Sequence, residues 1–511
     1  MAELRLSIWE YVADDPKTEW GANINHGGVK RRLSTYCLVA REWHEFFASR
    51  LFRKLTVSKD LEFMQLRQLS FNQKKFIKHI WLRIDLAMYP YEQCWETEDA
   101  VWHGTNIGIA TGTLVEFFCQ MAWHGSWLVS EPDESSGGMT LEISIHSPSD
   151  RQHHFRNLYD FDAEPDPTRP WLSDPFDAPD YPFGGAQYDR ENAIVPFLRL
   201  FGHSALDVQL NGRLPVLRFI TRLVVRRQTR RRLTPPAACL ILKALPNLEE
   251  VAVEFWREFS VFEQARADRG HKFILDRVLP QSLKRLTLFE DFGEELMDVL
   301  AERSEHVGDV DTVRVADPEV GKALAKRSLK LERVAVSFVV DAKDFFEECV
   351  SHPEWAWTEL ESLSLTFGVL GFGLYRGTWQ HYTPGHKRIY KRMNKMLLDA
   401  SAVVRRMPKL KILEIWDGGE ARASLFRYEL DNGTAAVTWK CAPQVELQDE
   451  VVEAWEAAAR DMGAREFTAV SRALVQALLW SHGHAIRQLG LKIPVLDAGS
   501  EAQIVREHFG L

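Results

Sequence analysis

The second half of the chain repeats a short phrase: an apolar residue, two mostly polar residues, an apolar residue, any residue and an apolar residue. The copies are ITRLVV from Ile220, LEEVAV from Leu248, LKRLTL from Leu283, LERVAV from Leu331, LESLSL from Leu360, LKILEI from Leu410 and IRQLGL from Ile486. Three of them follow a proline turn, and helix-like segments such as PPAACLILKAL and NKMLLDASAVVRRM precede several copies. Helix, proline turn and short strand in repetition is the pattern of a leucine-rich repeat.

The distances between successive copies are irregular, at 28, 35, 48, 29, 50 and 76 residues. Regular leucine-rich repeats recur every ~20–29 residues, so insertions must bulge from the stack or the array is degenerate. One such unit cannot bury its apolar face alone, and stacked neighbours supply the core. Helix candidates at 449–462 and 466–480 are expected to cover the end of the stack.

The first half of the chain holds further elements and one clear break. RKLTVS, FIKHIWLRIDL and MTLEISIHS have the apolar alternation of short strands, and a helix is expected over 114–123. The segment 160–185 holds six prolines and seven acidic residues. Helices and central strands do not tolerate that proline density, so an exposed loop and a domain boundary are predicted there.

The N-terminus carries two apolar stripes at helical spacing. Leu4, Ile8, Tyr11 and Val12 share one helical face, which ends at the Asp-Asp-Pro of 14–16. The glycine-containing stretch 17–30 is expected to be a loop. A second stripe follows in LSTYCLVAREWHEFFASRLF, where Tyr36, Val39, Ala40, Trp43, Phe46 and Phe47 recur at three- and four-residue steps.

These N-terminal residues resemble the F-box of large fungal families, which opens on Leu-Pro-x-Glu-Leu-Arg. Glu3-Leu4-Arg5 and Ile8-Trp9-Glu10-Tyr11 match the opening, and the run from Leu38 to Trp43, LVAREW, matches the close. The family's leading Leu-Pro would fall at or before Met1, and the insertion at 16–30 is longer than a compact F-box needs. The resemblance covers roughly the first 57 residues, and the remainder is more loosely similar to the leucine-rich bodies that follow such F-boxes.

The resemblance implies a substrate receptor of a cullin-RING ubiquitin ligase, bound to the ligase core through a Skp-type adaptor and holding a target on its repeats. It assigns the adaptor contacts to Leu4, Ile8, Leu38, Val39 and Trp43. An apolar helical face in a partner groove is the physical mode expected for them. The alternative interpretation is that these side chains pack the helices onto the repeat body.

The expected fold is therefore a mixed α+β or α/β chain: F-box-like helices, then an irregular solenoid of short parallel strands and helices. The predicted divisions are an F-box-like motif at 1–57, a first part of the repeat body at 58–159, a proline- and aspartate-rich loop at 160–190, and a repeat body with a helical cap at 191–511.

A dense basic run is the candidate for target recognition. It consists of Arg226, Arg227, Arg230, Arg231 and Arg232. Guanidinium groups bind phosphate and carboxylate groups through paired hydrogen bonds, which suits a phosphorylated or acidic target. The alternative is a solvated loop paired with acidic neighbours such as those at 160–180.

Composition limits the function classes. The net charge of −9 argues against bulk nucleic-acid binding. The six cysteines are scattered without a C-x-x-C, which favours reduced thiols in a cytosolic or nuclear protein. No stretch of about 18 apolar residues predicts a membrane span, and the N-terminus has no secretory apolar core.

No catalytic residue, cofactor or metal ligand is predicted. G-x-S-x-G, H-E-x-x-H, P-loop and G-x-G-x-x-G motifs are absent. The histidine pairs at 153–154 and 482–484 lack further ligands at metal-site spacing, and the D-x-D at 309–311 is better explained as a turn. Two other functions remain open: a non-ligase interaction scaffold, and an enzyme with an unfamiliar site within 90–200.

Overall fold

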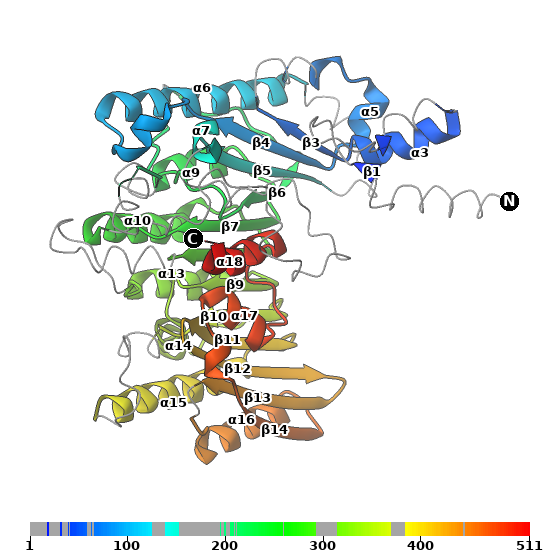
Figure 1. Ribbon diagram of the computed structural model, residues 1–511. Helices are drawn as coiled ribbons and strands as arrows, with labels where there is room; N and C mark the ends of the chain where they lie inside the picture. Colours follow the sequence, from blue (N-terminus) through cyan, green and yellow to red (C-terminus); the bar gives the residue numbers. More distant parts are fainter. Residues whose placement is uncertain are drawn as a thin grey trace.

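A long, mostly parallel sheet organises the molecule in this computed structural model (Figure 1). The structure describes residues 18–19, 31–32, 39, 41–58, 63, 66–124, 138–152, 195, 199–200, 205–292 except 209, 211 and 259, 314–368, 384–442 and 445–510. The sheet has 12 strands, and their spatial order follows the sequence from β3 to β14. Each interior strand therefore pairs with the strands before and after it in the chain, and β3 and β14 form the two edges.

Nine of these strands run parallel: β3 (Lys54–Val57), β4 (His79–Asp85), β5 (Met139–His146), β6 (Ile220–Val225), β7 (Glu250–Trp256), β8 (Arg285–Asp291), β9 (Arg333–Ser337), β10 (Ser362–Thr366) and β11 (Ile412–Gly419). Then β12 (Arg422–Asp431) and β13 (Thr434–Ala442) turn back as antiparallel strands, and β14 (Glu466–Ala473) lies parallel to β13 at the edge. Asn432 and Gly433 link β12 to β13 with φ values of 49° and 82°. Two positive-φ residues suit a two-residue hairpin turn.

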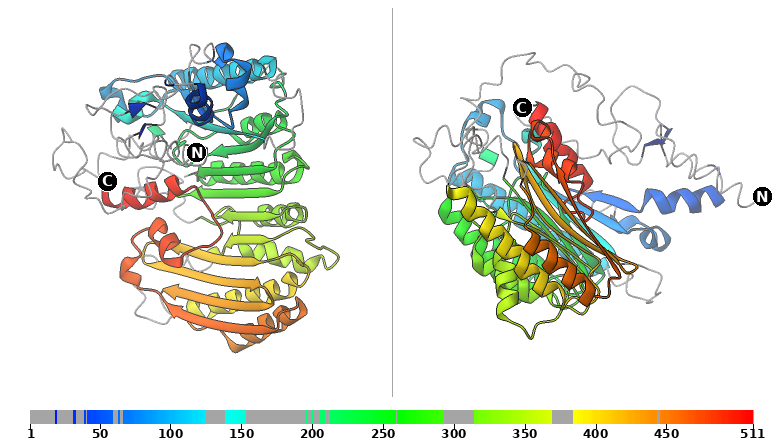
Figure 2. Two further views of the ribbon diagram at one scale, coloured as in Figure 1. Left: turned by 90° about the vertical axis from the view of Figure 1, so that its right-hand side faces the viewer. Right: turned by 90° about the horizontal axis from the view of Figure 1, so that it is seen from below.

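Helices cover one face of this sheet (Figure 2). They are α6 (Ala100–His124), α9 (Pro235–Lys243), α10 (Val261–Phe273), α13 (Pro318–Ser328), α14 (Ala342–Ser351), α15 (Pro384–Val404) and α16 (Asp449–Asp461). Caps define several starts: Thr234 accepts a hydrogen bond from the Ala237 N–H, and Asp317 from the Glu319 N–H, each just before a proline. Proline suits a first helical turn because its missing N–H would have no partner there.

Other helices lie away from that layer. They are α3 (Arg41–Leu51), α5 (Phe71–Lys75), α7 (Pro148–Gln152), α17 (His482–Leu489) and α18 (Ala498–Gly510). Helix α3 projects away from the sheet beside the start of β3, whereas α17 and α18 lie on the sheet face opposite the helical layer (Figures 1 and 2). We call that opposite face the open face.

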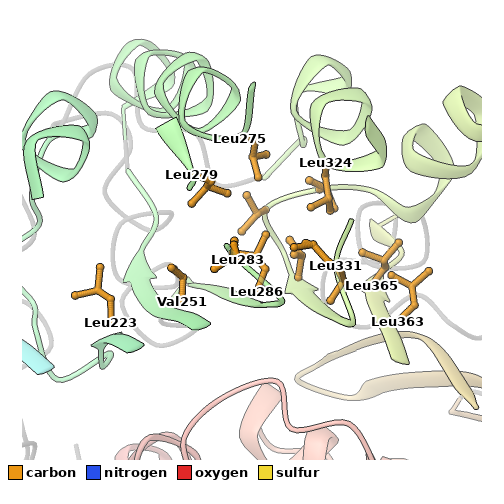
Figure 3. Packing of buried hydrophobic residues seen from close by; sticks show 14 of the residues in the cluster. Leu223, Val251, Leu275, Leu279, Leu283, Leu286, Leu324, Leu331, Leu363 and Leu365 are labelled. Atoms are coloured by element: carbon orange, nitrogen blue, oxygen red, sulfur yellow. The ribbon is translucent and has the colours of Figure 1, made fainter. Parts of the chain in front are cut away.

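The main core lies between the sheet and its helical layer. Leu283 and Leu331, the first leucines of two repeated phrases, are buried ahead of their strands, and Leu286 points into the same layer (Figure 3). Val334 belongs to the same core. Helix residues such as Leu324 meet them. Burying one such side chain contributes roughly 1.5–3 kcal/mol to the stability of the fold. The apolar residues of the phrase therefore form the buried face of each unit.

Six copies of the phrase form the strands predicted for them, β6 to β11. The copy from Ile486 is wrong as a strand, because it lies in α17 and the turn after it. Ser481 caps that helix, and Gly490 ends it with a φ of 60°. Local capping determines the structure of this segment, although its apolar pattern matches the strands.

Two other expectations differ from the structure. The helix expected over 466–480 is wrong: β14 occupies most of it, followed by a 3-10 turn, Gln476–Leu478. The expected loop at 17–30 includes Thr18–Glu19 (β1), which pairs with Arg31–Arg32 (β2). The helix expected over 449–462 is confirmed as α16, and that over 114–123 lies within α6. The first N-terminal helix and the whole of 160–190 lie outside the described residues.

Candidate interaction face

The open face carries a row of charged side chains close to the amino-terminal ends of the strands. Strand register places Arg222, Glu250, Arg285 and Arg333 side by side on β6 to β9. Glu250 lies 2.8 Å from both Arg222 and Arg285 through its two carboxylate oxygens. Arg222 keeps 46% of its side chain exposed, and Arg333 is also exposed. This charged row contains more positive than negative charge and is accessible to a partner.

A buried polar group lies on the neighbouring strands β4 and β5, in register with Val224, two residues after Arg222 on β6. Glu142 on β5 is buried and contacts His79 at 2.8 Å and Arg226 at 3.1 Å. Burial opposes ionisation of this carboxyl, yet the hydrogen bond from His79 and the charge of Arg226 lower its pKa. Trp81 lies buried beside it on β4 and donates a hydrogen bond to Ser144 Oγ at 2.8 Å.

The C-terminal segment crosses the open face over the later strands. After β14 the chain returns through α17 and α18, which run back towards β7 (Figures 1 and 2). We call residues 479–505 the clasp. Its apolar residues Ile486, Leu489 and Ile493 pack in a second core against Trp416 and Leu425 of the sheet. In a repeat protein of this kind, the face opposite the helices is expected to be free to bind a ligand. The clasp buries part of that face here.

Glu254 on β7 anchors the far end of the clasp. Its carboxylate accepts hydrogen bonds from the Arg227 N–H at 2.9 Å, the Asp497 N–H at 2.5 Å and Ser500 Oγ at 2.5 Å. Two of these donors, Asp497 just before α18 and Ser500 in its first turn, attach the start of the helix to β7. Burial outweighs these bonds and raises the pKa of Glu254 to about 7.

Glu414 on β11 holds the clasp at a second point. Its two oxygens accept hydrogen bonds from the N–H groups of Lys492, at 2.9 Å, and Ile493, at 3.1 Å. Arg427 on the adjacent strand pairs with the same carboxylate at 2.6 Å. The buried carboxylates of Glu254 and Glu414 thus accept hydrogen bonds from backbone N–H groups of the clasp. The clasp forms no strand at either point.

The five arginines of the basic run lie in the β6–α9 loop, at the carboxyl ends of the parallel strands. Four of them, Arg227, Arg230, Arg231 and Arg232, are buried, and Arg226 is half-buried. The alternative of a solvated loop is therefore wrong. Their role in target binding stays a prediction, but the geometry favours a structural one for the buried four.

Carboxylates from several elements pair with these arginines. Arg227 Nε lies 2.5 Å from Asp291 on β8, and its guanidinium stacks over Trp256 at 4.6 Å. Arg231 lies 2.6 Å from Glu98, and Arg232 lies 2.7 Å from Glu258. A buried guanidinium is tolerated only with such a partner, because losing water is costly. Acidic partners expected from 160–180 lie outside the described residues.

The adaptor residues are only partly within the described chain. Leu4, Ile8 and Leu38 lie outside the described residues. Val39 is 59% exposed ahead of α3. Trp43 is half-buried, with its ring 5.5 Å from that of Phe47. Exposure at Val39 agrees with a partner contact, whereas Trp43 also packs within its own helix.

Sequence reasoning did not identify the acidic partners. Glu142, Glu254 and Glu414 are isolated carboxylates in apolar strands, Asp291 follows Glu290 at the end of β8, and none of them belongs to a motif. The one available signal is a charged residue at a position where a parallel strand is usually apolar on both faces. Among the described residues, no three His, Cys, Asp or Glu side chains gather in a way that could hold a metal ion. No helix in that part of the chain could span a membrane.

Comparison with known proteins identifies one region. No curated protein matches the chain. Residues 278–497 match a family of unknown function, DUF6546. The match begins just before β8 and ends one residue before α18, so it includes the later strands and most of the clasp. Over these residues the chain is similar to that family, whose own function is unknown.

Proposed function

We propose that this protein is a non-catalytic, leucine-rich-repeat-like receptor that presents a target to a ubiquitin ligase. In this proposal the N-terminal segment binds a Skp-type adaptor of a cullin-RING ligase, and the sheet binds the target. One observation carries the proposal: strands in sequence order have a continuous helical layer on one face and an exposed charged row on the part of the other face that carries β6 to β9. A solenoid of this kind offers a broad surface suited to another macromolecule.

The position of α3 supports the adaptor half of the proposal. The helix begins two residues after Val39 and projects away from the sheet beside the start of β3 (Figure 1). A partner could therefore bind the N-terminal segment without displacing the body. Helix-in-groove docking on a few apolar anchors would be sufficient, because few residues usually dominate an interface.

The adaptor half is tested with the full chain and a purified Skp-type adaptor. We expect the wild type to bind and Val39→Asp to weaken binding at least tenfold, since a carboxylate would have to enter an apolar groove. Val101→Asp is the matched control, because Val101 is 74% exposed but lies at the start of α6. Equal binding by all three proteins would refute the assignment of Val39.

The target half is tested by charge reversal on the charged row. Arg222→Glu with Arg333→Glu should abolish capture of an acidic target in proximity labelling. Arg405→Glu is the control: Arg405 is 42% exposed and pairs with Asp461 near the end of α15, on the helical side. An unchanged set of labelled proteins in the row variant would contradict this placement of the target.

A non-ligase scaffold is the second candidate, because the exposed charged row on the sheet could bind a target without any adaptor. It predicts loss of target capture in the row variant together with no adaptor binding by the wild type. The enzyme alternative within 90–200 falls largely outside the described residues. Turnover that survives both sets of variants would support it.

A further inference from the structure

The last strand of the sheet has an open edge. β14 pairs with β13 on one side, and within the described residues no strand pairs with its other side. Seven of its eight residues are exposed, and Phe467 is half-buried. The strand contains neither proline nor a register shift. Proteins usually protect such edges with these features, so an unprotected edge can accept another strand.

The hydrogen bonds to β13 determine which backbone groups point outward. The Glu466 N–H donates to the Gly433 carbonyl, and the Leu474 N–H donates to the Cys441 carbonyl. In a parallel pair, alternate residues bond to the same neighbour, so even-numbered residues of β14 face β13. The backbone groups of the odd-numbered residues therefore face outward: Phe467, Ala469, Ser471 and Ala473.

This alternation limits how the strand can pair with itself. In an antiparallel pair, outward-facing residues must lie opposite outward-facing residues to exchange hydrogen bonds. Centring the pair on Ala469 satisfies this rule and places Glu466 opposite Arg472 of the second copy, twice. Shifting the centre to 468 or 470 keeps the hydrogen bonds but separates those charges. Only the centre at Ala469 places Thr468 opposite Val470 as well, and β-branched residues of this kind are favoured in strands.

We propose that two copies of this chain form a dimer through antiparallel β14–β14 pairing, with the two-fold axis at Ala469. The pairing joins two sheets edge to edge and keeps both open faces on the same side. Val475, Leu478 and Trp480, all exposed just after β14, supply apolar surface next to the joint. The inference is independent of the proposed ligase function. If both hold, the dimer would be a bivalent receptor with two target-binding faces.

Light scattering of the full-length chain tests the pairing. The wild type should have twice the 58.8 kDa chain mass at micromolar concentration. Glu466→Arg alone, or Arg472→Glu alone, should raise the dimer dissociation constant at least tenfold by placing like charges opposite each other. The double variant should restore the dimer. A monomeric wild type, or a double variant as weak as the single ones, overturns the proposal.

A cysteine placed on the axis tests the register. Ala469→Cys, in a Cys119→Ser background that removes an exposed thiol, should form an inter-chain disulfide under mild oxidation. Opposite residues in such a pair have Cα atoms ~5.5 Å apart, within the disulfide range of ~4.4–6.8 Å. Ser471→Cys is the control, since its two copies would lie about four residues apart along the strands. Equal cross-linking of both variants, or of neither, overturns the register.

Discussion

Replacement of Glu254 by glutamine should change how tightly the clasp closes, and in a pH-dependent manner. The wild-type carboxyl is buried and accepts two hydrogen bonds from the start of α18 and one from the Arg227 N–H, and its pKa is raised to about 7 from an ordinary 4.5. Opening of α18 returns this group to water. The closed state then holds a proton that the open state releases.

The sign follows from that difference in proton binding. Between pH 4.5 and about 7 the closed state binds the extra proton, so its stability falls as pH rises. At roughly 1.4 kcal/mol per pH unit the loss amounts to about 3 kcal/mol, or about a hundredfold in the opening constant. Glutamine does not ionise, so its opening should not follow this titration. The substitution should destabilise the closed state by about 1 kcal/mol at pH 5, because the NH2 of the glutamine amide cannot accept one of the three hydrogen bonds.

Hydrogen exchange of the α18 amides at pH 5 and pH 8 measures both effects, after correction for intrinsic exchange rates. The wild type should open about a hundredfold more often at pH 8, and Glu254→Gln should show little change. Glu414→Gln is the matched control, since it removes an acceptor for the clasp at 492–493 rather than at α18. An α18 pH dependence identical in the wild type and Glu254→Gln would refute the reasoning.

Three further predictions concern burial and backbone strain. Asp291→Asn leaves the buried Arg227 without its carboxylate and should cost about 3–5 kcal/mol of unfolding free energy, seen as a lower denaturant midpoint; a shift under 0.5 kcal/mol contradicts it. Gly490→Ala, at φ 60°, should cost about 1 kcal/mol, whereas Gly104→Ala, exposed within α6, should be neutral or stabilising in thermal denaturation. Iodoacetamide should label exposed Cys119 in the folded protein faster than any buried cysteine among the described residues, and equal rates in mass spectrometry would contradict this.

Part of the fold could be predicted from the sequence because the signals are local. The repeated phrase located β6 to β11 since an apolar alternation beside a proline turn is determined within one unit. The strands of the first half were recognised in the same way. The phrase from Ile486 failed because capping by Ser481 and the turn at Gly490 determine that segment.

The candidate face required the tertiary structure. The arginine run reads as a solvated or target-binding loop, because burial of a charge depends on carboxylates such as Asp291 that lie far away in sequence. The sequence does not show that the clasp returns to the open face, since its contacts with Glu254 and Glu414 span long stretches of chain. The sequence by itself determined the apolar periodicity, and so the mostly parallel layer of strands and helices. Only the tertiary structure decided which charges are buried, which face is covered and which edge is free, because those outcomes depend on pairings between distant residues.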